Sequence, residues 1–153
     1  MSAFPACGIY RTGQPLGEIP AGRLVYFHNH GDPGPGIYLP KGWQLNRAQW
    51  HAGGTTVPDA AWASTLQPLA PEGFYRVETP FTCCEKNCRT YEKELLVQLG
   101  YNGEGEAILF VPEWTPSGLA IPVTGNMISQ ALTKRLVPLR VQSAPELEKG
   151  PLN

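Results

Sequence analysis

Glycine and proline punctuate this chain from end to end. The 153 residues include 17 Gly and 16 Pro, which together exceed one fifth of the sequence and are spread along its whole length. Proline removes a backbone donor and glycine weakens helices, so the segments between them are short. Short apolar runs bounded by such residues are typical of strands joined by tight turns. The sequence therefore predicts an all-β fold with one or two short helices, as a compact small barrel or sandwich.

Eight short stretches have the composition of strands, being rich in β-branched, aromatic and other apolar residues. They cover residues 8–11, 22–29, 36–40, 73–82, 94–101, 106–112, 118–123 and 136–141. The clearest hairpin is ELLVQLGYNGEGEAILFVPEW, in which Asn102-Gly103 is expected to take the positive φ angles of a tight turn. Both faces of its second strand are apolar, so we expect that strand to be buried on both sides or to lie in an interface.

Two segments are expected to be helical. One begins at Asp59, which can cap it, and ends near Leu66 before a proline. The other begins at Asn126 as its cap and carries apolar residues at helical spacing until Pro138 ends it. We expect residues 1–141 to form a single β-rich domain and residues 142–153 to form a polar tail.

A four-residue pattern recurs three times along the chain. It reads GIYR at 8–11, GIYL at 36–39 and GFYR at 73–76. In each copy glycine allows the chain to turn and the following aromatic residue can pack on a sheet. Because such short matches arise by chance, we interpret them as recurring strand starts and not as a repeat architecture.

The charge and the ends of the chain bear on its partners and location. Only 16% of the residues are charged and the net charge is −1, without a basic cluster, so nucleic acid is not an expected partner. No apolar run is long enough to span a bilayer, so no membrane association is expected. The first ten residues lack the features of a secretory signal. We therefore expect a cytoplasmic protein whose cysteines are reduced.

Histidine and cysteine offer one candidate site. In the stretch RLVYFHNHGDPGPG, His28 and His30 are two residues apart, so on a strand they would share one face and could reach the same ion. The segment TPFTCCEKNC supplies Cys84 and Cys88 at a spacing used by zinc ligands, with Cys83 as a substitute. The metal-site hypothesis is a zinc site of His28, His30, Cys84 and Cys88.

Other interpretations of the same residues stay open. The histidines can end a hairpin strand whose turn is GDPGPG, and the cysteines can pack as small apolar side chains. In an oxidising compartment a Cys83–Cys88 disulfide is a further option. A cysteine nucleophile with His51 as its base is also conceivable.

The segment GRLVYFHNH resembles the start of the cupin metal-binding motif at Gly22, His28 and His30. The glutamate that follows in that motif is missing, since positions 34 and 35 are Gly and Pro, and only His51 could supply the third histidine. The resemblance covers nine residues and lacks half of the metal ligands, so the chain is not assigned to that family.

These features favour a non-catalytic β-rich interaction module, such as a structural or accessory subunit of a larger assembly. The low charge and the two-sided apolar strands predict a protein partner or self-association. No cofactor is expected for that function. The alternative is a small metal-binding protein or metalloenzyme that uses zinc at His28, His30 and the cysteine cluster.

Overall fold

The structure, a computed structural model, describes residues 4–31, 34–83 and 89–142. It is mostly β, as predicted, and its strands form several antiparallel sheets. None of the sheets in the described ranges closes into a barrel, so the prediction of a barrel or sandwich is not confirmed. Of the described helices, none has the length and apolar character needed to cross a bilayer.

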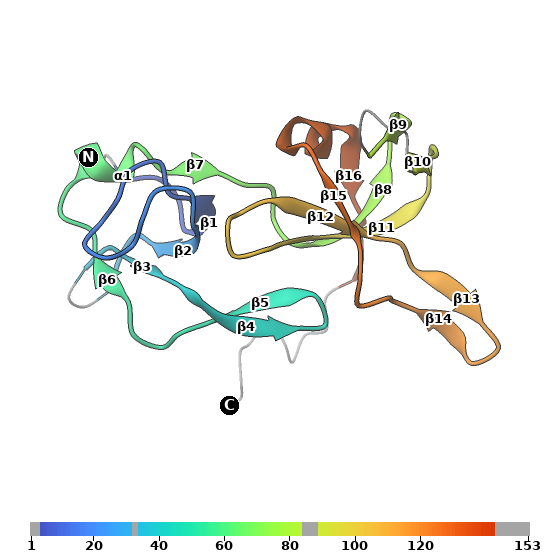
Figure 1. Cartoon of the computed structure of the whole chain (residues 1–153), viewed down its shortest axis with the longest axis horizontal. Helices are drawn as coiled ribbons and strands as arrows, with labels where there is room; N and C mark the ends of the chain where they lie inside the picture. The colour runs from blue at the N-terminus through green and yellow to red at the C-terminus, as the bar shows by residue number, and fades with distance from the viewer. Residues whose placement is uncertain (1–3, 32–33, 84–88, 143–153) are drawn as a thin grey trace.

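The first five-stranded sheet contains the N-terminal strands (Figure 1). Its order is β6-β3-β2-β1-β7, and the short helix α1, Ala60–Ala63, precedes its last strand. The strands are β1 (Gly8–Arg11), β2 (Leu24–His28), β3 (Gly36–Tyr38), β6 (Thr55–Thr56) and β7 (Gln67–Pro68).

The second five-stranded sheet is built from the later part of the chain. Its order is β15-β12-β11-β8-β16, and the 3₁₀ helix η1, Gln130–Arg135, precedes its last strand. The strands are β8 (Gly73–Val77), β11 (Leu96–Tyr101), β12 (Ala107–Phe110), β15 (Asn126–Ile128) and β16 (Leu136–Pro138).

Three two-stranded hairpins complete the described strands. The hairpin β4–β5 follows β3, and the hairpin β13–β14 follows β12, so each is inserted after the third strand of a five-stranded sheet. Their strands, together with those of the β9–β10 hairpin, are β4 (Pro40–Gln44), β5 (Arg47–Trp50), β9 (Phe81–Thr82), β10 (Thr90–Tyr91), β13 (Glu113–Thr115) and β14 (Gly118–Ala120).

The two large sheets have the same topology. Numbered within its own sheet, each has the order 4-3-2-1-5, with an inserted hairpin after the third strand and a short helix before the fifth. We call residues 8–68 the N-terminal repeat and residues 73–138 the C-terminal repeat. The chain therefore folds as two copies of one arrangement, although the sequence pattern was interpreted only as recurring strand starts.

The strand registers of the two repeats agree residue by residue. Tyr10 pairs with Val25 and Pro68, and Tyr75 pairs with Val97 and Pro138. The patterns GIYR and GFYR thus open equivalent strands, whereas GIYL lies in β3 and has no such counterpart. The segments LQPL at 66–69 and LVPL at 136–139 also occupy equivalent positions, a second signal that the four-residue pattern alone did not reveal.

Hydrogen bonds outside the sheets are duplicated as well. The Tyr10 hydroxyl donates to the carbonyl of Ala6 at 2.7 Å, and the Tyr75 hydroxyl donates to the carbonyl of Pro71 at 2.6 Å, four residues upstream in both cases. The amide of Leu69 donates to Ile9, as that of Leu139 donates to Phe74. The tyrosine bonds hold the chain that precedes the first strand of each repeat, and the leucine bonds join that strand to the residue after the last strand. Because both copies keep them, they belong to the fold and not to one local sequence.

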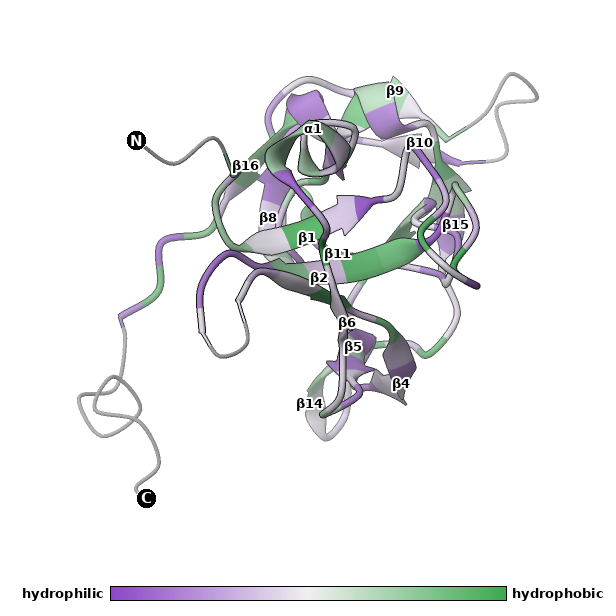
Figure 2. Ribbon diagram, turned by 90° about the vertical axis from the view of Figure 1, so that its left-hand side faces the viewer, coloured by the Kyte–Doolittle hydropathy of each residue, from purple (hydrophilic) through white to green (hydrophobic). Residues whose placement is uncertain are grey.

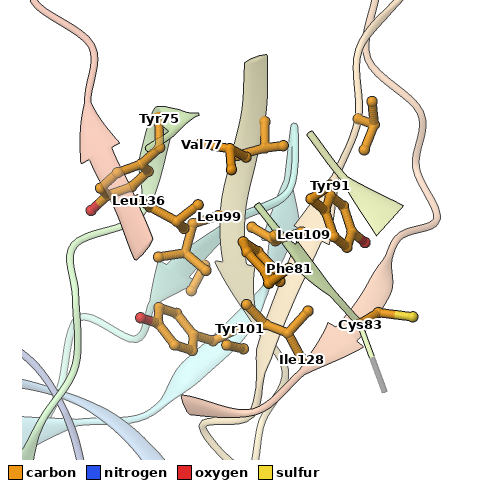
Figure 3. Packing of buried hydrophobic residues seen from close by; sticks show 14 of the residues in the cluster. Tyr75, Val77, Phe81, Cys83, Tyr91, Leu99, Tyr101, Leu109, Ile128 and Leu136 are labelled. Carbon is orange, nitrogen blue, oxygen red and sulfur yellow. The ribbon is translucent and has the colours of Figure 1, made fainter. Parts of the chain in front are cut away.

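Each repeat buries an equivalent set of apolar side chains. Figure 2 colours the ribbon by hydropathy, and Figure 3 shows the buried cluster of the C-terminal repeat. The matched buried pairs are Tyr10 and Tyr75, Val25 and Val97, Phe27 and Leu99, Ile37 and Leu109, Val57 and Ile128, and Leu66 and Leu136. The C-terminal core is enlarged by Phe81 and Tyr91 of the β9–β10 hairpin, whose rings stack at 5.0 Å. Leu24 of the N-terminal repeat also packs in this core, which joins the two repeats. The prediction of a single domain over 1–141 stays a prediction.

All eight predicted strand stretches contain a strand, but several differ in extent. The predicted strand 73–82 is divided into β8 and β9, and between them the amides of Glu78 and Thr79 both donate to the carbonyl of Arg135. Residues 41–50 were not predicted as strand, and together with Pro40 they form the β4–β5 hairpin. Its turn residues Leu45 and Asn46 both have positive φ, at 53° and 66°, which suits a two-residue hairpin turn.

The predicted helices are shorter than expected. Asp59 caps α1 as predicted, accepting a bond from the amide of Trp62, but the helix ends at Ala63. The prediction that Asn126 caps a longer helix was wrong, because Asn126 pairs with Leu109 in β15. The cap is Ser129, which accepts from the amide of Ala131, and the helix is of the 3₁₀ type.

The hairpin β11–β12 forms as predicted, but its turn differs. The positive φ lies at Gly105, at 72°, and not at Asn102-Gly103. The amide of Gly105 donates to the Asn102 carbonyl, while the Asn102 side chain accepts from the amides of Glu104 and Glu106. The side-chain bonds of Asn102 therefore stabilise a longer turn with its left-handed residue near the end.

A pair of equivalent glycines yields a test of the packing in both repeats. A Cβ added at Gly54 would lie 2.7 Å from the carbonyl oxygen of Ile37, and one at Gly125 would lie 2.4 Å from that of Leu109. We expect Gly54→Ala to lower the free energy of unfolding by about 1–3 kcal/mol in urea denaturation, as overpacking typically does. The neighbouring Gly53→Ala is the control, since a Cβ there meets nothing within 4 Å. Equal stabilities of the two variants would contradict the close approach of these strands.

Candidate metal centre

Three side chains that can bind a metal meet at one edge of the N-terminal repeat. Cys7 directly precedes β1, His28 is the last residue of β2, and His30 follows two residues later. Because β1 and β2 are antiparallel with Gly8 opposite Phe27, extending the register by one residue brings Cys7 opposite His28. One ligand atom from each of the three lies within 4.8 Å of the others. The pairing of two strands therefore assembles the cluster.

The distances in this cluster suit a tetrahedral metal. Cys7 Sγ lies 3.6 Å from His28 Nδ1 and 3.8 Å from His30 Nδ1. A zinc ion with bonds of about 2.3 Å to sulfur and about 2.0–2.1 Å to nitrogen holds S and N about 3.6 Å apart. The two imidazole rings are 4.0 Å apart between centroids, at an angle of 47°.

Asn29 lies between the two histidines and organises the cluster. Its side-chain amide donates to the carbonyl of Pro5 at 3.0 Å, which turns Oδ1 towards the cluster. That oxygen lies 2.8 Å from His30 Nδ1 and accepts the Cys7 thiol at 3.3 Å. The backbone amide of Asn29 also donates to Cys7 Sγ at 3.3 Å. Asn29 thus contacts both Cys7 and His30 and helps to hold them next to each other.

The turn after His30 brings the chain close to the imidazoles. Gly31 has a φ of 108°, in a region that side chains disfavour. A Cβ at this position would lie 3.4 Å from Cδ2 of His28. The strands β2 and β3 are antiparallel neighbours, as expected for a hairpin, while Asp32 and Pro33 of the predicted GDPGPG turn lie outside the described residues. His28 and His30 therefore lie at the end of a hairpin and also take part in a ligand cluster.

The predicted cysteine ligands lie elsewhere or outside the described residues. Cys83 is buried in the core of the C-terminal repeat next to Phe81, and its amide donates to the carbonyl of Arg89. It is not part of the cluster with His28 and His30. Cys84 and Cys88 lie outside the described residues, so their part of the zinc hypothesis and the Cys83–Cys88 disulfide stay predictions.

Cys7 is the candidate ligand that the sequence analysis did not identify. It is exposed and stands alone in the sequence, 21 residues from His28. Its only signal was its place immediately before the predicted strand 8–11, and that becomes informative only when the partner strand and the register are known. His51 is exposed, its backbone amide donates to Leu39, and it does not join the cluster.

A cavity of about 330 Å³ opens beside the cluster and includes Cys7 in its wall. Tyr26 and Trp50, whose ring centroids are 5.8 Å apart, form an aromatic side of this cavity. Arg47 and Glu72 bring opposite charges to it. A ligand bound at the metal site would therefore have space and both polar and aromatic contacts on one side.

Glu72 is the partly buried carboxylate of this cavity. Burial raises its pKa above the ordinary value of 4.5, and this effect exceeds the opposing effects of the Ala48 amide and of Arg47. The amide of Ala48 donates to Glu72 Oε2 at 3.0 Å. The carboxylate thus fixes β5 to the segment that joins the two repeats.

The equivalent place in the C-terminal repeat carries different side chains. By register, Glu72 takes the position of Cys7, Gly100 that of His28, and Asn102 that of His30. A Cβ at Gly100 would lie 2.8 Å from the carbonyl oxygen of Asn46, so the β4–β5 turn occupies the space that an imidazole would need. The three-ligand cluster is therefore specific to the N-terminal repeat.

Comparisons with protein-family models, curated proteins and solved structures found no significant match.

The raised pKa of Glu72 predicts a pH-dependent stability. Folded protein holds the proton of Glu72 at pH values where unfolded protein has lost it, so unfolding releases a proton and stability falls as pH rises through the raised pKa. Glu72→Gln keeps an oxygen acceptor for the Ala48 amide without the charge. We expect the variant and the wild type to agree at about pH 4 and the variant to be more stable at about pH 7, above the ordinary range of Glu. Urea denaturation at both values measures this; a variant that is less stable at neutral pH would contradict it.

Proposed function

We propose that this protein binds a transition metal through Cys7, His28 and His30. The observation that supports the proposal is the approach of their three ligand atoms to within 4.8 Å of one another. One thiolate and two imidazoles form a donor set of the kind that zinc prefers over magnesium or calcium. Zinc is therefore the proposed ion, with Cys7 in place of Cys83, Cys84 or Cys88 as the thiolate ligand.

Three protein ligands leave one position of a tetrahedral ion open. Structural zinc sites usually have four protein ligands, whereas catalytic sites have three and keep one for water or substrate. The cavity with Arg47 and Glu72 lies beside this site. These features support a site that exchanges a ligand, whether for binding or for a reaction, and they assign no particular substrate.

We infer a second function, that of a β-rich interaction module and accessory subunit of an assembly. It is favoured by the β13–β14 hairpin, which exposes Trp114 at 82% and Leu119 at 49%. Exposed tryptophan and leucine on a protruding hairpin are typical of protein contacts. The proposed form of each repeat is a small, bent β unit of the barrel or sandwich type.

The metal proposal predicts one zinc per chain and a strong dependence on each ligand. We expect Cys7→Ser and His28→Ala each to weaken zinc binding by more than about 100-fold, beyond the 10–100-fold typical of a residue that only supports a ligand. Asn29→Ala should fall within that 10–100-fold range, because it keeps the ligands and removes their supporting bonds. Competition with a chromogenic chelator measures each affinity.

Two controls separate this site from the alternatives. His51→Ala removes an exposed histidine outside the cluster and should leave zinc affinity unchanged. Cys88→Ser tests the predicted cysteine ligands and should also have no effect. A loss of zinc in Cys88→Ser with no loss in Cys7→Ser would overturn the proposal in favour of the original ligand set.

A further inference from the structure

The inserted hairpin of the N-terminal repeat binds the C-terminal repeat within the same chain. The indole nitrogen of Trp43 donates to the carbonyl of Tyr101 at 2.8 Å. At the turn, the Asn46 side chain donates to Gln98 at 2.9 Å, and Gln98 in turn donates to the Leu45 carbonyl at 3.0 Å. This is an interface between a hairpin and the outer face of a repeat, made of side-chain bonds to backbone and amide groups.

The C-terminal repeat carries an equivalent hairpin at the same place. In β13–β14, Trp114 lies opposite Leu119, as Trp43 lies opposite Ala48 in β4–β5, and a two-residue turn follows one pair later in both. Each hairpin follows the third strand of its repeat, after Leu39-Pro40 or Val111-Pro112. Trp114 is therefore the counterpart of Trp43.

The second hairpin has no equivalent acceptor within the described chain. Trp114 is 82% exposed, against 44% for Trp43, and within the described ranges its indole nitrogen makes no hydrogen bond. Figure 1 shows β13–β14 projecting from the C-terminal repeat, away from the N-terminal repeat. Residues 113–120 contain a single charged residue, Glu113, so little charge would have to be desolvated on binding.

The N-terminal repeat, in contrast, has an acceptor face without a hairpin turn. Tyr26 of the N-terminal repeat takes the position that Gln98 has in the C-terminal repeat. Cys7 takes the position of Glu72, the residue that accepts a hydrogen bond from the Ala48 amide of the hairpin. Gln98 is only 3% exposed beneath the hairpin turn, whereas Tyr26 is half-buried and lines the cavity of about 330 Å³. The place that the hairpin turn covers in one repeat is thus a cavity in the other, with Arg47 and Trp50 of β5 in its wall.

We propose that the β13–β14 hairpin of one molecule docks on the face around Tyr26 of a second copy. This inference rests on the second function proposed above and gives its partner as another copy of the chain. Hairpin and face lie on different repeats, so the contact is heterologous, and each copy can offer a hairpin to one neighbour and a face to another. The result is a head-to-tail chain or a closed ring.

The contact between copies differs from the internal one at its centre. His28 stands where the C-terminal repeat has Gly100, and the turn Pro116-Ser117 replaces Leu45-Asn46. The turn of the second copy therefore cannot approach as closely as Asn46 does, and the contact relies on Trp114 and Leu119 against Tyr26 and the cavity. The metal cluster lies at the edge of the same face.

Two complementary variants test the head-to-tail arrangement. Trp114→Ser removes the hairpin anchor and leaves the face intact, while Tyr26→Glu places a charge on the face and leaves the hairpin intact. In sedimentation velocity over a range of concentrations, the wild type should form species larger than a dimer, and each variant alone should be monomeric. An equimolar mixture of the two should form a dimer and nothing larger, because only one hairpin and one face remain functional in each pair.

Controls and contrary outcomes are defined by the same measurement. Val141→Ser removes an exposed apolar side chain, 76% exposed, outside the hairpin and should associate like the wild type. Circular dichroism must show Tyr26→Glu folded; if it is not, Tyr26→Ser replaces it. A monomeric wild type at every concentration, association of Trp114→Ser like the wild type, or no dimer in the mixture would each overturn the proposal. The series is repeated with EDTA and with added zinc, which separates self-association from metal binding. If the protein associates in EDTA and has no affinity for zinc, only the metal proposal is refuted.

Discussion

The antiparallel pairing of the first two strands in each repeat, in one fixed register, is the constraint on which the rest of the structure depends. A shift by one residue would turn every side chain of a strand to the opposite face. In the observed register Val25 and Val97 enter the two cores, and Tyr26 and Gln98 face outwards. The same register sets Cys7 opposite His28, and in the other repeat it leaves Glu72 within reach of the Ala48 amide. Core, candidate metal centre and hairpin interface thus follow from one pairing that occurs twice.

The sequence predicted the class of the fold and the positions of most strands, because Gly and Pro limit segment length and apolar composition marks what lies between them. It did not predict the β4–β5 hairpin, since a tight turn at Leu45-Asn46 lacks the glycine that usually marks one, and the positive φ of Leu45 is sustained by the contacts of the turn with Gln98. Likewise, Asn126 has the composition of a helix cap, yet the close approach of Gly125 to the Leu109 carbonyl continues the sheet there. In both segments, tertiary contacts and not local sequence determine the backbone conformation.

The repeat and one of the three candidate ligands could not be deduced from the sequence for related reasons. The two copies keep backbone geometry and buried volume, while the side chains that fill them differ, as Phe27 and Leu99 do. Only short matches such as GIYR and GFYR survive, and these gain meaning once their strands are known to be equivalent. For the site, the His28 and His30 pair was evident from local spacing, whereas Cys7 joins them through a contact between residues 21 positions apart.

The difference between the repeats indicates how one scaffold supports two kinds of contact. At the edge next to the first strand, the C-terminal repeat has Gly100 and a carboxylate, and these admit a hairpin turn that comes within 3 Å of where a Cβ would lie. The N-terminal repeat has imidazoles and a thiol at the same edge, which exclude that turn and leave a cavity. Because the two side-chain sets compete for one space, a repeat can offer either the close hairpin contact or the ligand cluster. The hairpin of the last repeat is then left exposed, and the proposed contact would bury its apolar surface at the cavity beside Tyr26, which the turn of β4–β5 does not fill.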